Sequence, residues 1–111
     1  MLISRWVTPT VAPTRFDTLF FLLPVEEAPD VRVDGSEVLS HEWVTPQEAL
    51  RRHETGAWRM ILPTIAHLRW LTRRATISDA VASAQGADGR TLIRPEVASD
   101  GSFIPIHLPG T

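Results

Sequence analysis

The hydrophobic pattern begins with two apolar stretches near the N-terminus, separated by a loop rich in proline and threonine. Residues 2–7 (LISRWV) and 16–25 (FDTLFFLLPV) have the β-branched and aromatic content typical of strands. Within the second stretch, residues 19–23 are apolar without interruption. Such a run is typical of a strand buried on both faces, so we expect 16–25 to be a central strand with helices on each side.

A third strand is predicted over residues 37–44 (EVLSHEWV), where apolar and mixed positions alternate. An acidic, turn-rich segment, 26–36, precedes it, and Asp34 and Gly35 predict a tight turn there.

Three helices are predicted after this strand. Thr45-Pro46-Gln47-Glu48 is a capping box with proline at the first helical position, so a helix is expected from Pro46 to about His53. Pro63 begins the second, which ends near Arg74. Its expected apolar stripe comprises Ile61, Ile65, Leu68 and Leu71 or Thr72. Trp70 lies off this stripe, and we expect it to meet a third helix, which begins at a Thr76 or Ser78 cap and is stopped by Gly86.

The chain divides into a folded part, residues 1–85, and an extended tail, 86–111, that packs on it. Turns at Asp88-Gly89 and Asp100-Gly101 interrupt the tail, and its prolines confine any extended piece to a sheet edge or the surface. The fold class is therefore α/β, with about three core strands and three helices.

Composition narrows the function classes. The 111 residues suffice for one domain, and a formal charge of −2 gives no reason to expect nucleic acid or an anionic membrane as partner. The absence of cysteine excludes disulfides, thiolate metal ligands and a cysteine nucleophile, and fits a cytoplasmic protein. No apolar run is long enough to cross a bilayer. All 11 basic residues are arginines, for which a coding bias is the simpler explanation than a special anion site.

Four residues are candidates for a site. Arg15 offers a two-pronged hydrogen-bonding group for phosphate and Phe16 an apolar face, both in a loop held by a rigid strand. They could equally cap the strand edge and enter the core. Asp17 could pair with Arg15 or merely cap the loop. Glu37, at the start of the third strand, could be a base or metal ligand, or simply an exposed glutamate.

Three segments in order resemble the C-terminal half of Nudix hydrolases, and most of all the acyl-coenzyme A diphosphatase branch. They are RWVTP…RFDTLFFLLP, SEVLSHEWVTPQEAL and WRMILPTIAHLRWL. The resemblance implies an α/β/α sandwich around a mixed sheet. It also implies hydrolysis of a diphosphate in a nucleoside-diphosphate-type substrate, with Mg²⁺ or Mn²⁺ as cofactor. By the same resemblance, Glu37 is the best match to a catalytic base or extra metal ligand. Arg15, Phe16 and Asp17 would line the substrate cleft, and Trp6 and Trp43 would be structural.

The metal-binding Nudix box, G-x5-E-x7-R-E-U-x-E-E-x-G-U with U a bulky aliphatic residue, is absent from the sequence. No metal site is therefore expected from this chain alone, and the sandwich should be incomplete. Residues 16–23 would lose neighbours on one edge and part of one face. We expect the chain alone to be inactive and marginally stable, or to pair with a box-bearing segment or a second copy. The alternatives are a box-less nucleotide-binding module and a protein-interaction module without catalysis.

Overall fold

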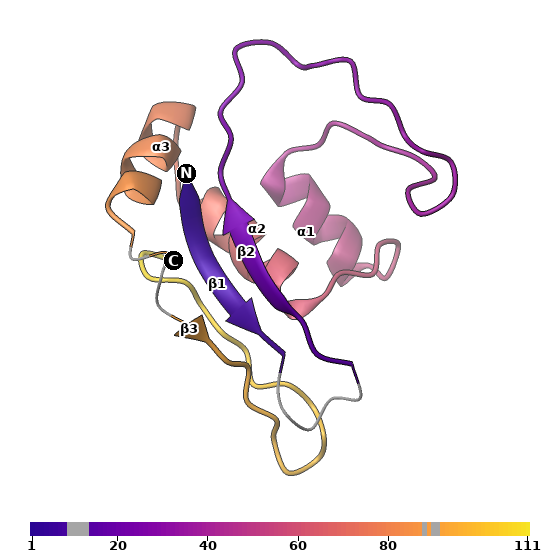
Figure 1. Ribbon diagram of the computed structural model, residues 1–111, viewed down its shortest axis with the longest axis vertical. Helices are drawn as coiled ribbons and strands as arrows, with labels where there is room; N and C mark the ends of the chain where they lie inside the picture. The colour runs from indigo at the N-terminus through magenta and orange to yellow at the C-terminus, as the bar shows by residue number, and fades with distance from the viewer. Residues whose placement is uncertain (9–13, 88, 90–91) are drawn as a thin grey trace.

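The computed structural model describes residues 1–8, 14–87, 89 and 92–111. It confirms a mixed α/β fold with a three-stranded sheet and three helices (Figure 1). The strands are β1 (Leu2–Val7), β2 (Asp17–Phe21) and β3 (Leu92–Ile93), and the helices are α1 (Pro46–Glu54), α2 (Leu62–Thr72) and α3 (Ile77–Gln85).

The sheet has the order β2-β1-β3, so β1 is the central strand. It pairs antiparallel with β2 and parallel with β3, with Arg5 opposite Leu19 on one side and Leu92 on the other. The N-terminus extends the first pairing, because Met1 and Leu22 each donate a main-chain N–H to the other's carbonyl at 2.7 Å.

The prediction that 16–25 is a central strand covered on both faces is wrong. β2 is a short edge strand, and helices cover only one face of it: Phe20 stacks on His67 of α2, with ring centroids 4.3 Å apart. Side chains alternate along a strand, so Leu19 and Phe21 point to the other face, where both are exposed. Of the described helices, none lies over that face (Figure 1). An unbroken apolar run therefore does not ensure burial here.

The predicted strand at 37–44 is also wrong, because these residues have no regular structure and the third strand is Leu92–Ile93 instead. Alternation alone cannot make a strand, since a strand needs a partner to bond its backbone. The tight turn before this segment is confirmed. Asp34 accepts backbone N–H bonds from Ser36 and Val38 at 3.1 and 2.8 Å, and Gly35 has the positive φ of +76° that the turn requires.

The predicted helices are confirmed with small differences. Thr45 caps α1 by accepting from the Glu48 N–H at 3.1 Å, and Thr76 caps α3. Glu48 does not return a hydrogen bond to Thr45. Its carboxylate instead accepts from Arg51 and Arg52 in the next turn.

The core lies where α2, α3, β1 and the tail meet. Its buried residues are Ile3, Trp6, Ala66, Trp70, Ala80, Ala84 and Leu108. The expected contact between Trp70 and the third helix is confirmed. The stripe expected on α2 is not the buried face: Ala66 and Trp70 are buried, whereas Ile61 is exposed. Trp6 is buried as expected, but Trp43 is exposed.

The tail is attached to the helices at its end. The Arg74 guanidinium lies 4.5 Å from the centre of the Trp70 ring and donates to the Gly110 carbonyl at 3.0 Å. Leu108, two residues earlier, is buried in the core. The tail residues therefore belong to the same packed unit as the sheet.

Candidate functional site

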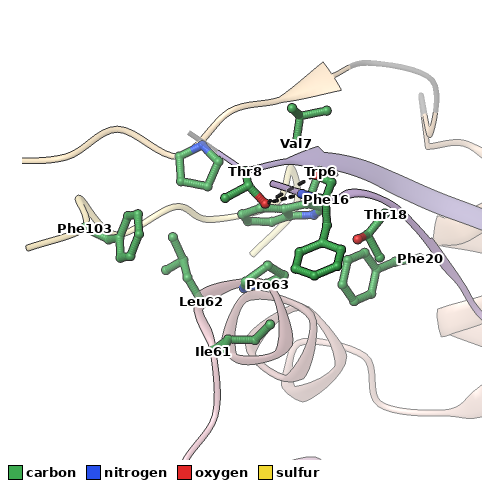
Figure 2. Close-up of a pocket in the computed structure, with 11 residues that line it drawn as sticks. Trp6, Val7, Thr8, Phe16, Thr18, Phe20, Ile61, Leu62, Pro63 and Phe103 are labelled. Carbon is green, nitrogen blue, oxygen red and sulfur yellow. Dashed lines mark hydrogen bonds between the residues drawn. The ribbon is translucent and has the colours of Figure 1, made fainter. Parts of the chain in front are cut away.

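An apolar pocket of about 270 Å³ lies between the sheet, the start of α2 and the tail (Figure 2). The strands contribute aromatic rings to one wall, the first residues of α2 form the floor in this view, and Phe103 lies at the far end. The lining residues are Trp6, Val7, Thr8, Phe16, Thr18, Phe20, Ile61, Leu62, Pro63, Pro95 and Phe103. None of them carries a formal charge, so the pocket suits an apolar group.

Phe16 is held at this pocket by a set of short hydrogen bonds to Thr8. The Thr8 backbone N–H donates to the Phe16 carbonyl at 3.0 Å, and the Phe16 N–H donates to Thr8 Oγ1 at 2.9 Å. The Thr8 hydroxyl also donates to the Phe16 carbonyl at 3.3 Å. These bonds join the end of β1 to the start of β2, so they fix where the Phe16 ring enters the pocket.

A buried polar chain supports the same wall. Trp6 Nε1–H donates to Ser4 Oγ at 2.9 Å, and Ser4 Oγ lies 2.7 Å from His67 Nε2. His67 Nδ1 lies 2.6 Å from the Pro63 carbonyl, which can only accept, so Nδ1 carries the proton. The Ser4 hydroxyl then donates a hydrogen bond to Nε2 of a neutral His67. Burial lowers the pKa of His67, and this outweighs the opposing effect of the Pro63 carbonyl.

The Ser4–His67 contact has the geometry of a nucleophile and its base, but it is not positioned for catalysis. Only 2% of the Ser4 surface is exposed, so no substrate reaches its hydroxyl. The second histidine nitrogen bonds a backbone carbonyl rather than a carboxylate. This chain of bonds therefore orients Trp6, which forms part of the pocket wall.

The structure separates the three neighbours expected to line one cleft. Phe16 enters the pocket, whereas Asp17 lies on the open face of the sheet and binds Arg5 through two hydrogen bonds of 2.9 and 2.6 Å. Among the described residues, the partner of the Asp17 side chain is therefore Arg5 rather than Arg15, and Arg5 lowers the pKa of Asp17. Arg15 is exposed immediately before the Phe16 position. The strand alternation, which sends neighbouring side chains to opposite faces, explains this division.

Glu37 is not brought to this pocket. It is exposed within the turn around Asp34, in the long excursion between β2 and α1, which leaves the opposite end of β2 from Phe16 (Figure 1). Three further lining residues, Phe103, Pro95 and Ile61, were not predicted from the sequence to belong to a site. No local pattern could have identified them, because only the tertiary fold brings the tail and the start of α2 to the same place.

Comparison with known proteins decides the relationship. The acyl-coenzyme A diphosphatase NUDT19 of Homo sapiens is 36% identical to the chain over 78 residues. Its counterpart in Xenopus laevis is 39% identical over 80 residues. Each match covers 68% of this chain. The chain is a relative of the Nudix hydrolases.

The matched region is only a small part of each relative. The chain spans about a fifth, 21%, of the length of each of these two Nudix relatives. No family model matches the sequence, and no solved structure matches the fold.

The metal expected of a Nudix hydrolase does not fit the residues present. Within residues 1–8, 14–87, 89 and 92–111, no three His, Cys, Asp or Glu side chains gather as a metal site would require. In the same described residues no helix is long and apolar enough to cross a bilayer.

Proposed function

We propose that this chain forms the C-terminal part of a Nudix diphosphatase that cleaves a coenzyme A or acyl-coenzyme A type substrate with Mg²⁺ or Mn²⁺. The single observation that carries the proposal is the 36–39% identity to proteins named acyl-coenzyme A diphosphatases. In this proposal, a separate segment bearing the Nudix box supplies the metal-binding glutamates. In this proposal the chain alone is inactive, because the carboxylates of its described residues do not cluster.

The open edge of β2 supports such a partner segment. Phe16 and Leu22 bond their backbones toward β1, and hydrogen bonding along an antiparallel pair alternates from residue to residue. The backbone groups of Asp17, Leu19 and Phe21 therefore face away from β1 and remain open to another strand. The same strand exposes the apolar side chains Leu19 and Phe21. A strand and a covering layer from the box-bearing segment would satisfy both.

The chemistry is hydrolysis of a phosphoanhydride. Water attacks one phosphorus, the bridging P–O bond breaks, and two phosphomonoesters leave. The metal, which glutamates of the box segment would hold, would offset the phosphate charge and activate the water. Within this proposal Arg15 binds a phosphate oxygen. Glu37, which the excursion places at the opposite end of β2, is assigned no part in this step.

The proposal is tested with two proteins, the purified chain and the same chain fused behind the Nudix-box segment of the human relative. Each is incubated with coenzyme A and Mg²⁺, and the phosphomonoester products are followed by chromatography and ³¹P NMR. We expect no cleavage by the chain alone and metal-dependent cleavage by the fusion. A fusion with glutamine at the box glutamates is the control. Cleavage by the chain alone, or none by the fusion, contradicts the proposal.

A second candidate function is ligand binding without hydrolysis. It is favoured by the pocket, which this chain builds entirely from its own residues, and by the lack of clustered carboxylates in the described part. Calorimetric titration with coenzyme A separates the two functions. Tight binding without Mg²⁺, together with an inactive fusion, would favour the binding module.

A further inference from the structure

Three large apolar side chains that solvent reaches surround the mouth of the pocket. These exposed residues are Phe16, Ile61 and Phe103. Phe16 directly precedes β2, Ile61 directly precedes α2, and Phe103 lies in the tail. Single exposed apolar residues are ordinary on a protein surface. Here separate segments bring them to one hollow, which is the arrangement of a site that buries an apolar ligand.

Two polar side chains of the lining, Trp6 and Thr8, are already engaged, and the Thr18 hydroxyl is a third that carries no charge. The Trp6 indole N–H is donated to Ser4, and the Thr8 hydroxyl both accepts from and donates to the Phe16 backbone. None of the lining side chains is an Arg or His that could bind a phosphate. Burying a charged group without a partner is costly, so the pocket excludes phosphate and accepts hydrocarbon.

The size of the pocket fits part of a ligand. At about 270 Å³ it lies just below the range of roughly 300–1,000 Å³ that encloses a whole drug-sized molecule. A coenzyme A thioester has a polar nucleotide end and a separate apolar acyl end, and only the latter matches this lining.

We propose that this pocket holds the acyl chain of an acyl-thioester ligand, with Phe16 as the ring that closes over it. The inference rests on the proposed function, because that function supplies the diphosphate-bearing part of the ligand. Each buried methylene is worth about 0.8 kcal/mol, so affinity rises about fourfold for each carbon added until the pocket is full.

The test measures binding to the purified chain by calorimetry. The ligands are coenzyme A and its acetyl, butanoyl, hexanoyl and octanoyl thioesters, with octanoyl-pantetheine and octanoate as ligands that lack the diphosphate. We expect affinity to increase with chain length. We also expect octanoyl ligands to shift the ¹⁵N–¹H NMR signals of Phe16, Thr18 and Phe103. Affinity independent of chain length overturns the proposal, as does a shift confined to other residues.

The variants include a matched control. Phe16→Ala should weaken octanoyl binding about tenfold and leave unacylated coenzyme A unaffected. Phe21→Ala removes the same side chain at nearly the same exposure, 64% against 65%, but from the opposite face of the sheet, and should change neither affinity. Thr18→Phe fills the pocket from an exposed position and should remove the length dependence. Equal losses in the Phe16 and Phe21 variants overturn the proposal.

Failure of this inference and failure of the proposed function give different results. If the fusion cleaves coenzyme A but neither binding nor cleavage depends on acyl length, the diphosphatase stands and the acyl pocket is overturned. If octanoyl-pantetheine binds in a Phe16-dependent manner while the fusion cleaves nothing, the acyl pocket stands and the diphosphatase fails. If octanoate binds as tightly as octanoyl-pantetheine, the thioester part contributes nothing to binding. The proposal of an acyl-thioester ligand is then overturned, and the pocket is a site for a fatty acid.

Discussion

At the scale of single residues, the pocket wall depends on one buried hydroxyl. The Ser4 hydroxyl accepts a hydrogen bond from the Trp6 indole N–H and donates one to His67 Nε2. No other described side chain bonds these two nitrogen atoms. Both partners also contact Phe20 through their rings. Removal of the hydroxyl would therefore affect three aromatic side chains together.

Ser4→Ala should lower the free energy of unfolding by about 1–3 kcal/mol, the cost of leaving buried polar groups unpaired. The measurement is urea unfolding followed by tryptophan fluorescence. Ser40→Ala, at an exposed serine, is the control and should lie within about 0.5 kcal/mol of the parent. Equal stabilities of the two variants would show that the Ser4 bonds contribute nothing net.

Residue-level reasoning from the sequence located part of the candidate site. It singled out Phe16, which does line the pocket, because a strand following a proline-rich loop must hold its first residues in place. It grouped Asp17 with Phe16, although adjacent residues of a strand face opposite ways. Phe103 was beyond its reach, since its position depends on how the tail folds back from far along the chain.

At the scale of elements, the three helices could be predicted from the sequence. Two of the three strand predictions were wrong: 16–25 forms an edge strand rather than a central one, and 37–44 forms no strand. A helix bonds within itself and carries local start signals, as Thr45 and Thr76 do. A strand depends on a distant partner. Residues 37–44 have the right alternation and find none, whereas Leu92–Ile93 is short and pairs with β1.

Glu48 should make the stability of α1 sensitive to acid. Hydrogen bonds from Arg51 and Arg52 lower the pKa of Glu48 to about 2, below its ordinary 4.5. A carboxylate with a lowered pKa contributes stability above its unfolded pKa, and the contribution fades as pH falls from about 4.5 toward 2. A ¹³C NMR titration of the Glu48 carboxyl should give a midpoint well below 4.5.

A second measurement follows the unfolding temperature of the protein as a function of pH. Glu48→Gln should lessen the fall in unfolding temperature between pH 5 and pH 2.5, whereas Glu54→Gln, in the last turn of the same helix, should leave it unchanged. A Glu48 midpoint at its ordinary value would show that the two arginines do not hold the carboxylate in solution.

At the scale of the whole molecule, the sheet is complete on one side and open on the other. β3 and the tail cover the far edge of β1, while β2 leaves backbone groups and apolar side chains in solvent. Leu19 and Phe21 are exposed on one face of β2, and β2 lies at the edge of the three-stranded sheet. The pattern of apolar residues could not reveal this, because the pattern is the same whether or not a neighbour is present.

The isolated chain should therefore self-associate through β2. Its apparent mass in sedimentation velocity should rise with concentration. Leu19→Lys, a charge on an exposed strand edge, should weaken association about tenfold. Leu39→Lys places the same charge at an exposed leucine in the β2–α1 excursion and should have little effect. A chain that stays monomeric at every concentration, or equal effects of both lysines, would contradict this.

The parallel pairing of β1 with β3 also governs how the protein must assemble. β1 must pair with a strand far along the chain, since Arg5 aligns with Leu92. Before β3 pairs, β1 and β2 form only a two-stranded hairpin, which is barely stable in water by itself. Contacts between such distant parts of a chain slow folding. The sheet is therefore completed late in folding, and the apolar hairpin is prone to aggregate until β3 has paired.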